Sequence, residues 1–419
     1  MNEAICRVRH RVLQESTSII VIVMRLALVC AVLCLAGCAI LPRNAVPADL
    51  MPEAVIPGMP EIRAPAGQIS AAMMSDLARS FDQESPSDFP IGPDGYVHYA
   101  HLVLSGGGAN GAFGAGLLSG WTKMGHRPVF KIVTGVSTGA LMAPYAFLGP
   151  DYDGALRQFY TTTASHNIFR RLSMVPQLLG GESLADTGPL MAMLEQAVDA
   201  EFLRAVAQAH ESGRRLYIGS ADLDSQRFVV WNMGLIATSG RSGALELFRR
   251  VMLASASVPI AFPPVFFDVE AGGRRYDEMH VDGAVSANVF YTGGAFSFSA
   301  ARAGVGRGHG REDIFVIHNG QLLPAPATTS RSLRSIAMRA FQLAAKSKTI
   351  GDLFRIYAVS LRESAGFKMI TIPEGAELSG SEVFDPVVMR QLYEIGYRKA
   401  LDGPVWSNDP PGLQFQPTP

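Results

Sequence analysis

The chain has 419 residues and a formal net charge of −1; 48% of its positions are hydrophobic and 17% are charged. A chain of this length and composition can bury one large core or two smaller ones, so we expect a globular protein. The near-zero net charge excludes the strong basic field of a nucleic-acid-binding protein and the acidic excess of a solvating tail.

All the cysteines lie close to the N-terminus, at Cys6, Cys30, Cys34 and Cys38. The body of the chain therefore has neither a disulfide framework nor a cysteine-based zinc site. Residues 24–42 contain Arg25 and then an apolar run of about eleven residues. Such a run is short for a membrane-spanning helix and typical of a signal peptide.

The tetrapeptide Leu-Ala-Gly-Cys that ends at Cys38 resembles a bacterial lipobox, in which the cysteine is diacylated and becomes the new N-terminus. We predict a signal peptide over residues 1–37, starting at Met1 or Met24, and a lipid on Cys38. Cleavage would remove four arginines and two glutamates, which changes the net charge from −1 to −3. Ala39 replaces the aspartate associated with inner-membrane retention, so the resemblance implies an outer-membrane protein that faces the periplasm. An uncleaved signal anchor is the alternative.

Prolines recur from Pro42 to Pro65 with little hydrophobic periodicity. Repeated proline favours an extended, semi-rigid chain, so residues 38–95 are interpreted as a tether between lipid and domain. The pattern within residues 68–82 is that of a short amphipathic helix. The folded domain is expected to start near Tyr96.

Strand-like and helix-like patterns then alternate along the chain. Strands are predicted at 98–104, 130–136, 215–220, 228–233, 313–318 and 367–372, and helices at 111–124, 138–148, 188–211, 244–255, 330–362 and 386–401. Alternation with near-continuous apolar strands indicates an α/β fold with a largely parallel central sheet flanked by helices. One domain over 96–405, followed by a tail at 406–419, accounts for the pattern.

The segment 291–313 interrupts this alternation with many glycines, which argue against a stable helix. Phe296 and Phe298 lie beside arginines there, so we expect either a segment that dips into a bilayer surface or a disordered insert.

Glycines cluster directly after the first predicted strand, at Gly106, Gly107, Gly108 and Gly111. The spacing Gly-x-Gly-x-x-Gly satisfies the dinucleotide-binding fingerprint, but that fingerprint needs an acidic residue about 20 positions later, and none is present. The second strand ends instead in Gly135-Val-Ser137-Thr-Gly139. Gly-x-Ser-x-Gly between a strand and a helix is typical of a nucleophile elbow.

Both glycine sites follow neighbouring strands, so Gly106 to Gly108 should lie beside the Ser137 hydroxyl. Backbone N–H groups at a helix N-terminus can donate to the oxyanion that forms when Ser137 attacks a carbonyl. The alternative interpretation is a glycine-rich turn that serves only close helix–strand packing.

A serine nucleophile needs a proton acceptor. Among the histidines, only His280 and His318 lie near or at the end of a predicted strand. Asp282-Gly283 is more distinctive, because a carboxylate ends a short apolar strand and the adjacent glycine clears space around it. A partly desolvated carboxylate can act as a base directly.

From about Tyr96 to Asn288 these motifs resemble the patatin-like phospholipases, a family of Ser-Asp dyad acyl hydrolases. The resemblance rests on the glycine loop, the Ser137 elbow, the segment Ser-Ala-Ser-Val-Pro-Ile-Ala-Phe-Pro-Pro-Val and Asp282-Gly283-Ala284. It implies a Ser137 nucleophile, an Asp282 base, an oxyanion hole at Gly106, Gly107 and Gly108, and supporting roles for Gly111, Gly135, Gly139 and Gly283. The implied substrates are phospholipids or other acyl-ester lipids, with no metal or cofactor.

One position departs from the family pattern, because Asn110 stands where the loop commonly carries arginine or lysine. Two alternatives remain open: an α/β-hydrolase esterase with a Ser137, Asp282, His318 triad, and an inactive lipoprotein that binds lipid or a partner. Under the dyad interpretation, Asp282→Asn should abolish turnover without changing thermal melting.

Overall fold

The computed structural model describes residues 24–25, 42–173, 181–307, 310–376, 380–404 and 406–413. Cys38 and the predicted lipobox lie outside the described residues. Across these described ranges, no helix is both long enough and apolar enough to cross a bilayer.

A nine-stranded mixed sheet forms the centre of the molecule, with the strand order β1-β7-β6-β3-β2-β10-β11 and β9 joining β6 to β8. Five strands from β6 to β11 run parallel, whereas β1, β7, β8 and β9 pair antiparallel with their neighbours. The strands are β1 (Arg63–Pro65), β2 (Val97–Leu104), β3 (Phe130–Gly135), β6 (Arg215–Asp222), β7 (Arg227–Asn232), β8 (Val265–Ala271), β9 (Arg274–Asp282), β10 (Gly310–His318) and β11 (Gly366–Thr371), with β4 (Arg170–Arg171) and β5 (Ala185–Asp186) in a separate ribbon.

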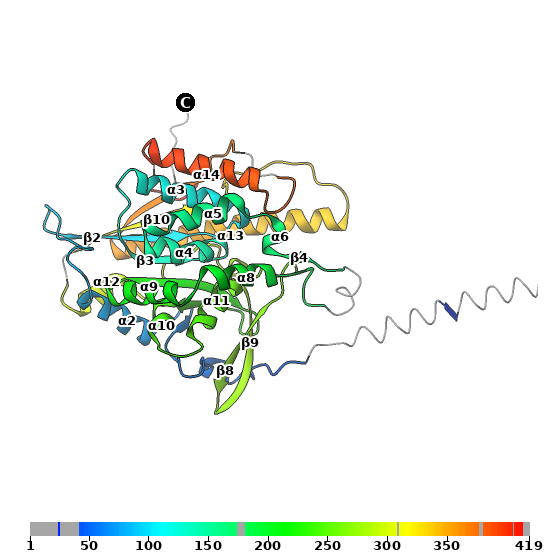
Figure 1. Cartoon of the computed structure of the whole chain (residues 1–419), viewed down its shortest axis with the longest axis horizontal. Coiled ribbons are helices and arrows are strands. Elements are labelled where there is room, and N and C mark those ends of the chain that lie inside the picture. The colour runs from blue at the N-terminus through cyan, green and yellow to red at the C-terminus, as the bar shows by residue number, and fades with distance from the viewer. Residues whose placement is uncertain are drawn as a thin grey trace, which may run out of the picture.

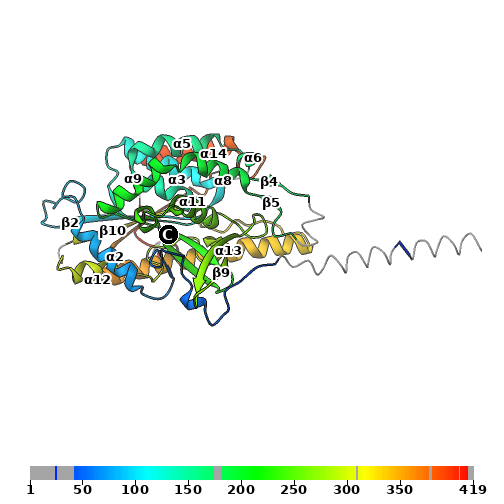
Figure 2. The ribbon, with the colours of Figure 1, turned by 60° about the horizontal axis from the view of Figure 1, so that its bottom comes forward.

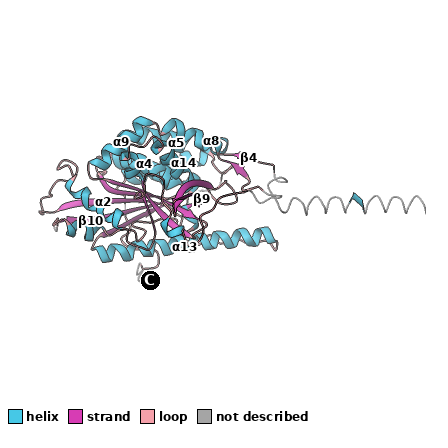
Figure 3. Ribbon diagram, turned by 90° about the horizontal axis from the view of Figure 1, so that it is seen from below, coloured by secondary structure: helices cyan, strands magenta, loops and turns pink. Residues whose placement is uncertain are grey.

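Helices cover both faces of this sheet (Figure 1). The first face carries α3 (Gly111–Lys123), α4 (Thr138–Leu148), α5 (Asp153–Thr162), α6 (Ser165–Ile168), α8 (Gly188–Ala197), α9 (Ala200–Glu211), α10 (Met233–Thr238), α11 (Ala244–Ser255) and α14 (Pro386–Leu401). The second carries α2 (Ala71–Asp82), α12 (Phe298–Gly304) and α13 (Leu333–Glu363). Figures 2 and 3 show the two helical layers with the strands between them. The predicted α/β class with a central sheet flanked by helices is confirmed, and the parallel part of the sheet is the five strands from β6 to β11.

Most predicted elements match an observed one within a few residues. The predicted helix over 188–211 is instead two helices, because the Asp199 side chain accepts a hydrogen bond from the Phe202 N–H at 2.8 Å and begins α9 anew. The β8–β9 hairpin, which extends from the sheet in Figure 1, was not predicted, although a short strand ending at Asp282 was expected.

The tether interpretation is wrong for residues 42–95, which pack against the domain. Strand β1 adds to the sheet edge beside β7, where Pro65 is tolerated because an edge position needs no N–H donor on its outer side. Ala45 and Val55 form bridges with β9 and β8. Helix α2 buries Met73, Leu77 and Phe81 in the second core. The folded domain therefore begins well before Tyr96.

The prediction for residues 291–313 is also wrong. Phe296 and Phe298 are fully buried in the second core, and Phe298 stacks edge-on against Tyr99. Residues 298–304 form helix α12, whose N-terminus is capped by the Ser297 hydroxyl. Arg302 pairs with the buried Glu312 at 2.7 Å. The phenylalanines fill a core and cannot reach a bilayer.

Candidate active site

Ser137 occupies the sharp turn between β3 and α4, with φ of 55° and ψ of −126°. A non-glycine residue in such a conformation costs on the order of 1–3 kcal/mol and persists only where the surroundings enforce it. A Cβ on Gly135 would lie 2.3 Å from the Gly139 carbonyl oxygen, and one on Gly139 would lie 2.3 Å from the Leu104 carbonyl oxygen. Glycine is required at both positions because three backbone segments meet there.

A serine that sequence analysis missed holds this turn in place. The Ser137 N–H donates to the Ser255 hydroxyl oxygen at 3.0 Å, and that hydroxyl donates to the Gly219 carbonyl at 2.6 Å. Ser255 ends α11 and Gly219 lies in β6, so the elbow is linked to the neighbouring strand. The only sequence signal for this role is that Ser255 begins the segment 255–265 that resembles the family.

The register of the sheet brings Asp282 to the same place. One edge of β6 changes its partner along its length. It pairs with β3 up to Ile218, which lies opposite Gly135, and then with β9, where Ser220 lies opposite Asp282. Strand β9 thus continues the sheet where β3 ends and the Ser137 elbow begins. Two bonds fix the carboxylate: the Ala284 N–H donates to its Oδ1 at 2.8 Å, and its own N–H donates to the Ser257 carbonyl at 2.8 Å.

Burial raises the pKa of the Asp282 carboxyl to about 6, while the Ser137 hydroxyl, the Ala284 N–H and the charge of Lys348 oppose that rise. Its Oδ2 atom is buried without a fully formed hydrogen bond among the described residues. A carboxylate with an unsatisfied oxygen and a pKa close to neutrality has the properties of a general base.

Gly283 keeps the backbone of this strand end close to β6. A Cβ there would lie 2.5 Å from the Gly219 carbonyl oxygen. Gly219 is also the residue to which the Ser255 hydroxyl donates. The elbow and the aspartate are therefore braced against one point of the sheet.

The glycine-rich loop differs from the prediction at one position. The Gly106 N–H donates to the Asn288 carbonyl at 2.9 Å, so it is not available as an oxyanion donor. The Gly107 and Gly108 N–H groups have no acceptor among the described residues, and both glycines border the cavity that contains Ser137. A Cβ on Gly106 would lie 2.4 Å from the Asn288 side-chain oxygen and 3.2 Å from the Ser137 Cβ. Gly106 is thus a close-packing position beside the serine.

Gly111 sets the start of α3 against the start of α4. A Cβ there would lie 2.5 Å from the Thr138 hydroxyl and 2.7 Å from the Tyr160 ring. Asn110, the departure from the family pattern, is not among the residues that line the Ser137 cavity within the described chain. Positive charge reaches that cavity from a different element, since Lys346 and Lys348 of α13 line it.

Ser137 and Asp282 open onto one cavity of about 580 Å³. Its walls are largely apolar and come from the glycine loop, the segment after α11, the turn after β9, the loop after β10 and helix α13. The lining includes Val258, Pro259, Ile260, Ala284, Val285, Asn288, His318, Gln321, Leu322, Phe341, Ala344, Ala345 and Thr349. Neither the size of the cavity nor the use of α13 as a wall is visible in the sequence.

Neither candidate histidine is bonded to the serine or the aspartate. His318 lines the cavity, but its Nδ1 is 3.1 Å from the Ser105 hydroxyl, and burial lowers its pKa to about 4. His280 is buried between the Ser220 hydroxyl, 2.8 Å from Nδ1, and Glu278, 3.2 Å from Nε2.

Within the described chain, one group of side chains has metal-ligand chemistry: Asp222, Glu278 and His280, whose ligand atoms lie within 4.8 Å of one another. Arg63 already forms a two-point ion pair with Glu278. None of the three lines the Ser137 cavity. The group is therefore explained by internal pairing.

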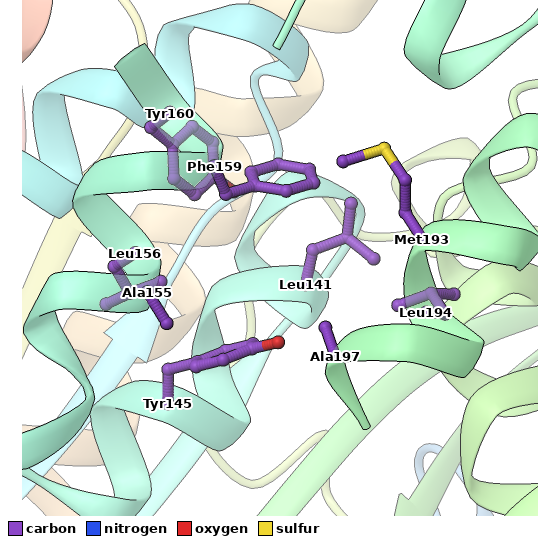
Figure 4. Close-up of a pocket in the computed structure, with 9 residues that line it drawn as sticks. All are labelled: Leu141, Tyr145, Ala155, Leu156, Phe159, Tyr160, Met193, Leu194 and Ala197. Carbon is purple, nitrogen blue, oxygen red and sulfur yellow. The ribbon is translucent and has the colours of Figure 1, made fainter. Parts of the chain in front are cut away.

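A second hollow lies between α4, α5 and α8 (Figure 4). Its lining is apolar, and Leu141, Tyr145, Phe159 and Met193 point into it. At about 50 Å³ it is too small for an acyl chain, and it contains neither Ser137 nor Asp282.

Residues 102–293 match the family model described as patatin-like phospholipase. The glycine loop, the Ser137 elbow and Asp282 all lie within this span. The chain therefore contains a patatin-like phospholipase domain over these residues. The match supports lipid acyl hydrolysis as the general class of activity.

Three solved structures resemble the chain at low identity. VipD from Legionella pneumophila is 12% identical, with 75% of this chain and 69% of that chain covered and a TM-score of 0.36. The type III effector ExoU is 14% identical, with coverages of 73% and 52% and a TM-score of 0.33. Human GIVD cytosolic phospholipase A2 is 10% identical, with coverages of 81% and 63% and a TM-score of 0.30. A comparison with curated protein sequences gives no match.

Proposed function

We propose that this protein cleaves fatty acyl esters of membrane lipids, with Ser137 as nucleophile and Asp282 as the only proton acceptor. The observation that carries the proposal is the meeting of a strained serine and a buried, under-bonded carboxylate at one apolar cavity. The alternatives lack an equivalent arrangement.

The proposed reaction begins when Asp282 accepts the proton of the Ser137 hydroxyl as Oγ bonds to the ester carbonyl carbon. The N–H groups of Gly107 and Gly108 donate to the developing oxyanion. When the ester C–O bond breaks, Asp282 returns the proton to the leaving alcohol. Water then attacks the acyl-serine and gives a proton to Asp282. The fatty acid leaves as Ser137 regains its proton, and no step needs a metal or cofactor.

The lining of the cavity supports a lipid with a charged head group. Val258, Ile260 and Leu322 offer an apolar wall for an acyl chain, whereas Lys346 and Lys348 also line the same cavity. A phosphodiester anion would meet these charges, which favours a phospholipid or lysophospholipid over a neutral ester.

The triad alternative requires His318 to accept the proton from Ser137. His318 is instead paired with the Ser105 hydroxyl, whose oxygen also accepts the Asn319 N–H at 2.8 Å. This arrangement favours a structural role for His318 in holding the start of the glycine loop.

Four single variants and one double variant test the proposed dyad. Ser137→Ala and Asp282→Asn should each lower phospholipid turnover by about 10² to 10⁴, and the double variant should be little worse because the two groups act as one unit. His318→Gln and His280→Gln should retain most activity. Fatty acid release is measured by mass spectrometry, and a fluorophosphonate probe should label wild type but not Ser137→Ala. A collapse in His318→Gln with activity kept in Asp282→Asn would replace the dyad by the triad.

We further propose that Cys38 carries the lipid and that the protein faces the periplasm from the outer membrane. The support is the lipobox-like sequence at residues 35–38. Fractionation of cells that express a Cys38→Ser variant tests this proposed location. A variant that stays membrane-bound at wild-type length would contradict it.

A further inference from the structure

Helix α13 changes character along its length. Its C-terminal half belongs to the second core, where Leu353 and Ile356 are buried. Its N-terminal half is uncovered among the described residues: Leu333 is 87% exposed, Phe341 67% and Leu343 70%. In Figures 2 and 3 this end of α13 reaches beyond the body of the domain.

The exposed half of α13 is amphipathic, but its apolar side faces outward. One row of side chains at helical spacing consists of Leu333, Ala337, Ala340 and Ala344, all exposed and flanked by Ile336 and Phe341. The opposite row consists of Ser335, Arg339, Gln342 and Lys346. A helix of a soluble domain normally turns its apolar side inward, so this orientation indicates a missing apolar partner.

The polar row is held against the protein. Arg339 donates to the Ala325 carbonyl at 2.5 Å, and Lys346 donates to the Leu323 carbonyl. These bonds fasten the loop before α13 along the polar side of the helix. The apolar row is consequently fixed toward solvent and cannot turn inward without breaking both contacts.

This surface is continuous with the mouth of the active site. Phe341, Ala344 and Ala345 line the Ser137 cavity from α13. Across the cavity, Ile260 is 76% exposed and Val285 is 50% exposed. The apolar row and the rim of the cavity therefore form one uncovered face, which we call the α13 face.

The segment that contains the loop before α13 and the exposed half of α13 is basic. Between Ile314 and Gly351 the sequence has five basic residues and no acidic residue, although the whole chain has a net charge of −1. A second copy that docked symmetrically would bring two such cationic segments together, which is unfavourable. Anionic lipid head groups next to an acyl layer match both the charge and the apolar row.

We propose that the α13 face docks on a lipid bilayer that contains anionic lipids, and thereby sets the mouth of the Ser137 cavity against the lipids of that bilayer. This inference rests on the proposed function for its substrate, but not for the docking itself. It replaces the 291–313 segment, whose phenylalanines are buried, as the element that meets the membrane.

The test compares two triple variants in a Cys38→Ser background, which removes any lipid anchor. Leu333→Ser/Ile336→Ser/Leu343→Ser, called the α13-face variant, changes two residues of the α13 face and the neighbouring exposed Leu343, none of which lines the cavity. Ile91→Ser/Leu361→Ser/Val387→Ser is the matched control, because it removes three exposed apolar side chains elsewhere. Thermal melting checks that both variants are folded.

Binding is measured by co-sedimentation with phosphatidylcholine vesicles, with and without phosphatidylglycerol. We expect the parent to bind the anionic vesicles more tightly, and the α13-face variant to lose at least about tenfold in vesicle affinity and in vesicle hydrolysis. Its kcat/KM on a soluble short-chain ester should stay within about twofold of the parent, as should every property of the control.

Equal vesicle binding by the parent and the α13-face variant would overturn the proposal. A parent dimer that the same variant converts to a monomer, without vesicle binding, would show instead that a second copy covers the face. Ser137→Ala separates the two proposals, since it should bind vesicles normally while hydrolysing nothing. An inactive parent that still binds anionic vesicles through α13 would refute the enzyme but not the docking.

Discussion

Replacing Asp282 by asparagine should stabilise the folded protein at neutral and alkaline pH, in addition to removing activity. From the sequence we expect unchanged melting, because asparagine conserves size and hydrogen bonding. The structure changes that expectation, because the carboxylate is buried with Oδ2 lacking a fully formed hydrogen bond among the described residues. Ionising such a group in the folded state costs free energy that asparagine avoids.

The magnitude follows from the pKa of the carboxyl. Burial raises it from the ordinary 3.8 to about 6. A tenfold change in proton affinity corresponds to about 1.4 kcal/mol, so this rise corresponds to roughly 3 kcal/mol. Between about pH 4 and pH 6 the folded carboxyl holds its proton while the unfolded one has lost it, so the stability of the wild type falls as the pH rises through that window. The advantage of Asp282→Asn is therefore near zero at pH 4 and reaches up to about 3 kcal/mol at pH 8.

Urea unfolding of wild type and Asp282→Asn at several pH values between 4 and 8 measures this difference. Asp49→Asn is the control, because Asp49 is exposed. The reasoning would be refuted by a difference that is independent of pH, or by one that is largest in acid. A less stable Asp282→Asn protein at pH 8 would show that the carboxylate is well solvated in the folded state.

Three further outcomes are expected. Because Asp282 must be ionised to accept a proton, the kcat/KM of the wild type should fall to about a tenth of its plateau value at pH 5. Lys348→Gln should move this decrease in kcat/KM to higher pH, because the charge of Lys348 lowers the pKa of Asp282. Gly139→Ala should lower the free energy of unfolding by several kcal/mol, because the new Cβ would lie 2.3 Å from a carbonyl oxygen. Gly154→Ala, on the exposed side of α5, is the control and should be neutral or slightly stabilising in the same thermal unfolding experiment. Arg63→Met should destabilise the domain by up to about 3–5 kcal/mol, because it removes the cationic partner of the buried Glu278 carboxylate and leaves only His280 beside it. An unchanged unfolding curve would argue that β1 is dispensable.

Much of the fold was predictable because it depends on local pattern. Near-continuous apolar runs gave the parallel strands β2, β3, β6, β10 and β11, since a strand buried on both faces carries no polar alternation. Ser137 was predictable for a related reason. A strained turn crowded by backbone accepts only glycine on either side, so the turn leaves a short Gly-x-Ser-x-Gly motif in the sequence. Asp282-Gly283 marked a strand end in the same way.

Other features depend on which surfaces meet, and the sequence carries no local signal for them. The segment before Tyr96 has the prolines of a linker, yet it packs because the edge of β7 and the β8–β9 hairpin accept it. Phe296 and Phe298 have the composition of a membrane-facing loop, but the second core has space for their rings. Gly106 has the motif of an oxyanion donor, but the Asn288 carbonyl takes its N–H.

The surroundings of the site were decided in the same way. Ser255, which holds the Ser137 N–H, and Lys348, which acts on the Asp282 pKa, come from helices distant in sequence. The hydrophobic periodicity of these helices indicates only that each helix has a buried side. Periodicity and turn chemistry act within one element, so the sequence by itself determined the parallel strands, the elbow and the reactive residue types. The partners of each side chain depend on how the elements pack together. The tertiary structure alone therefore decided which N–H groups remain without an acceptor among the described residues, which carboxylate is buried away from water and which helix borders the cavity.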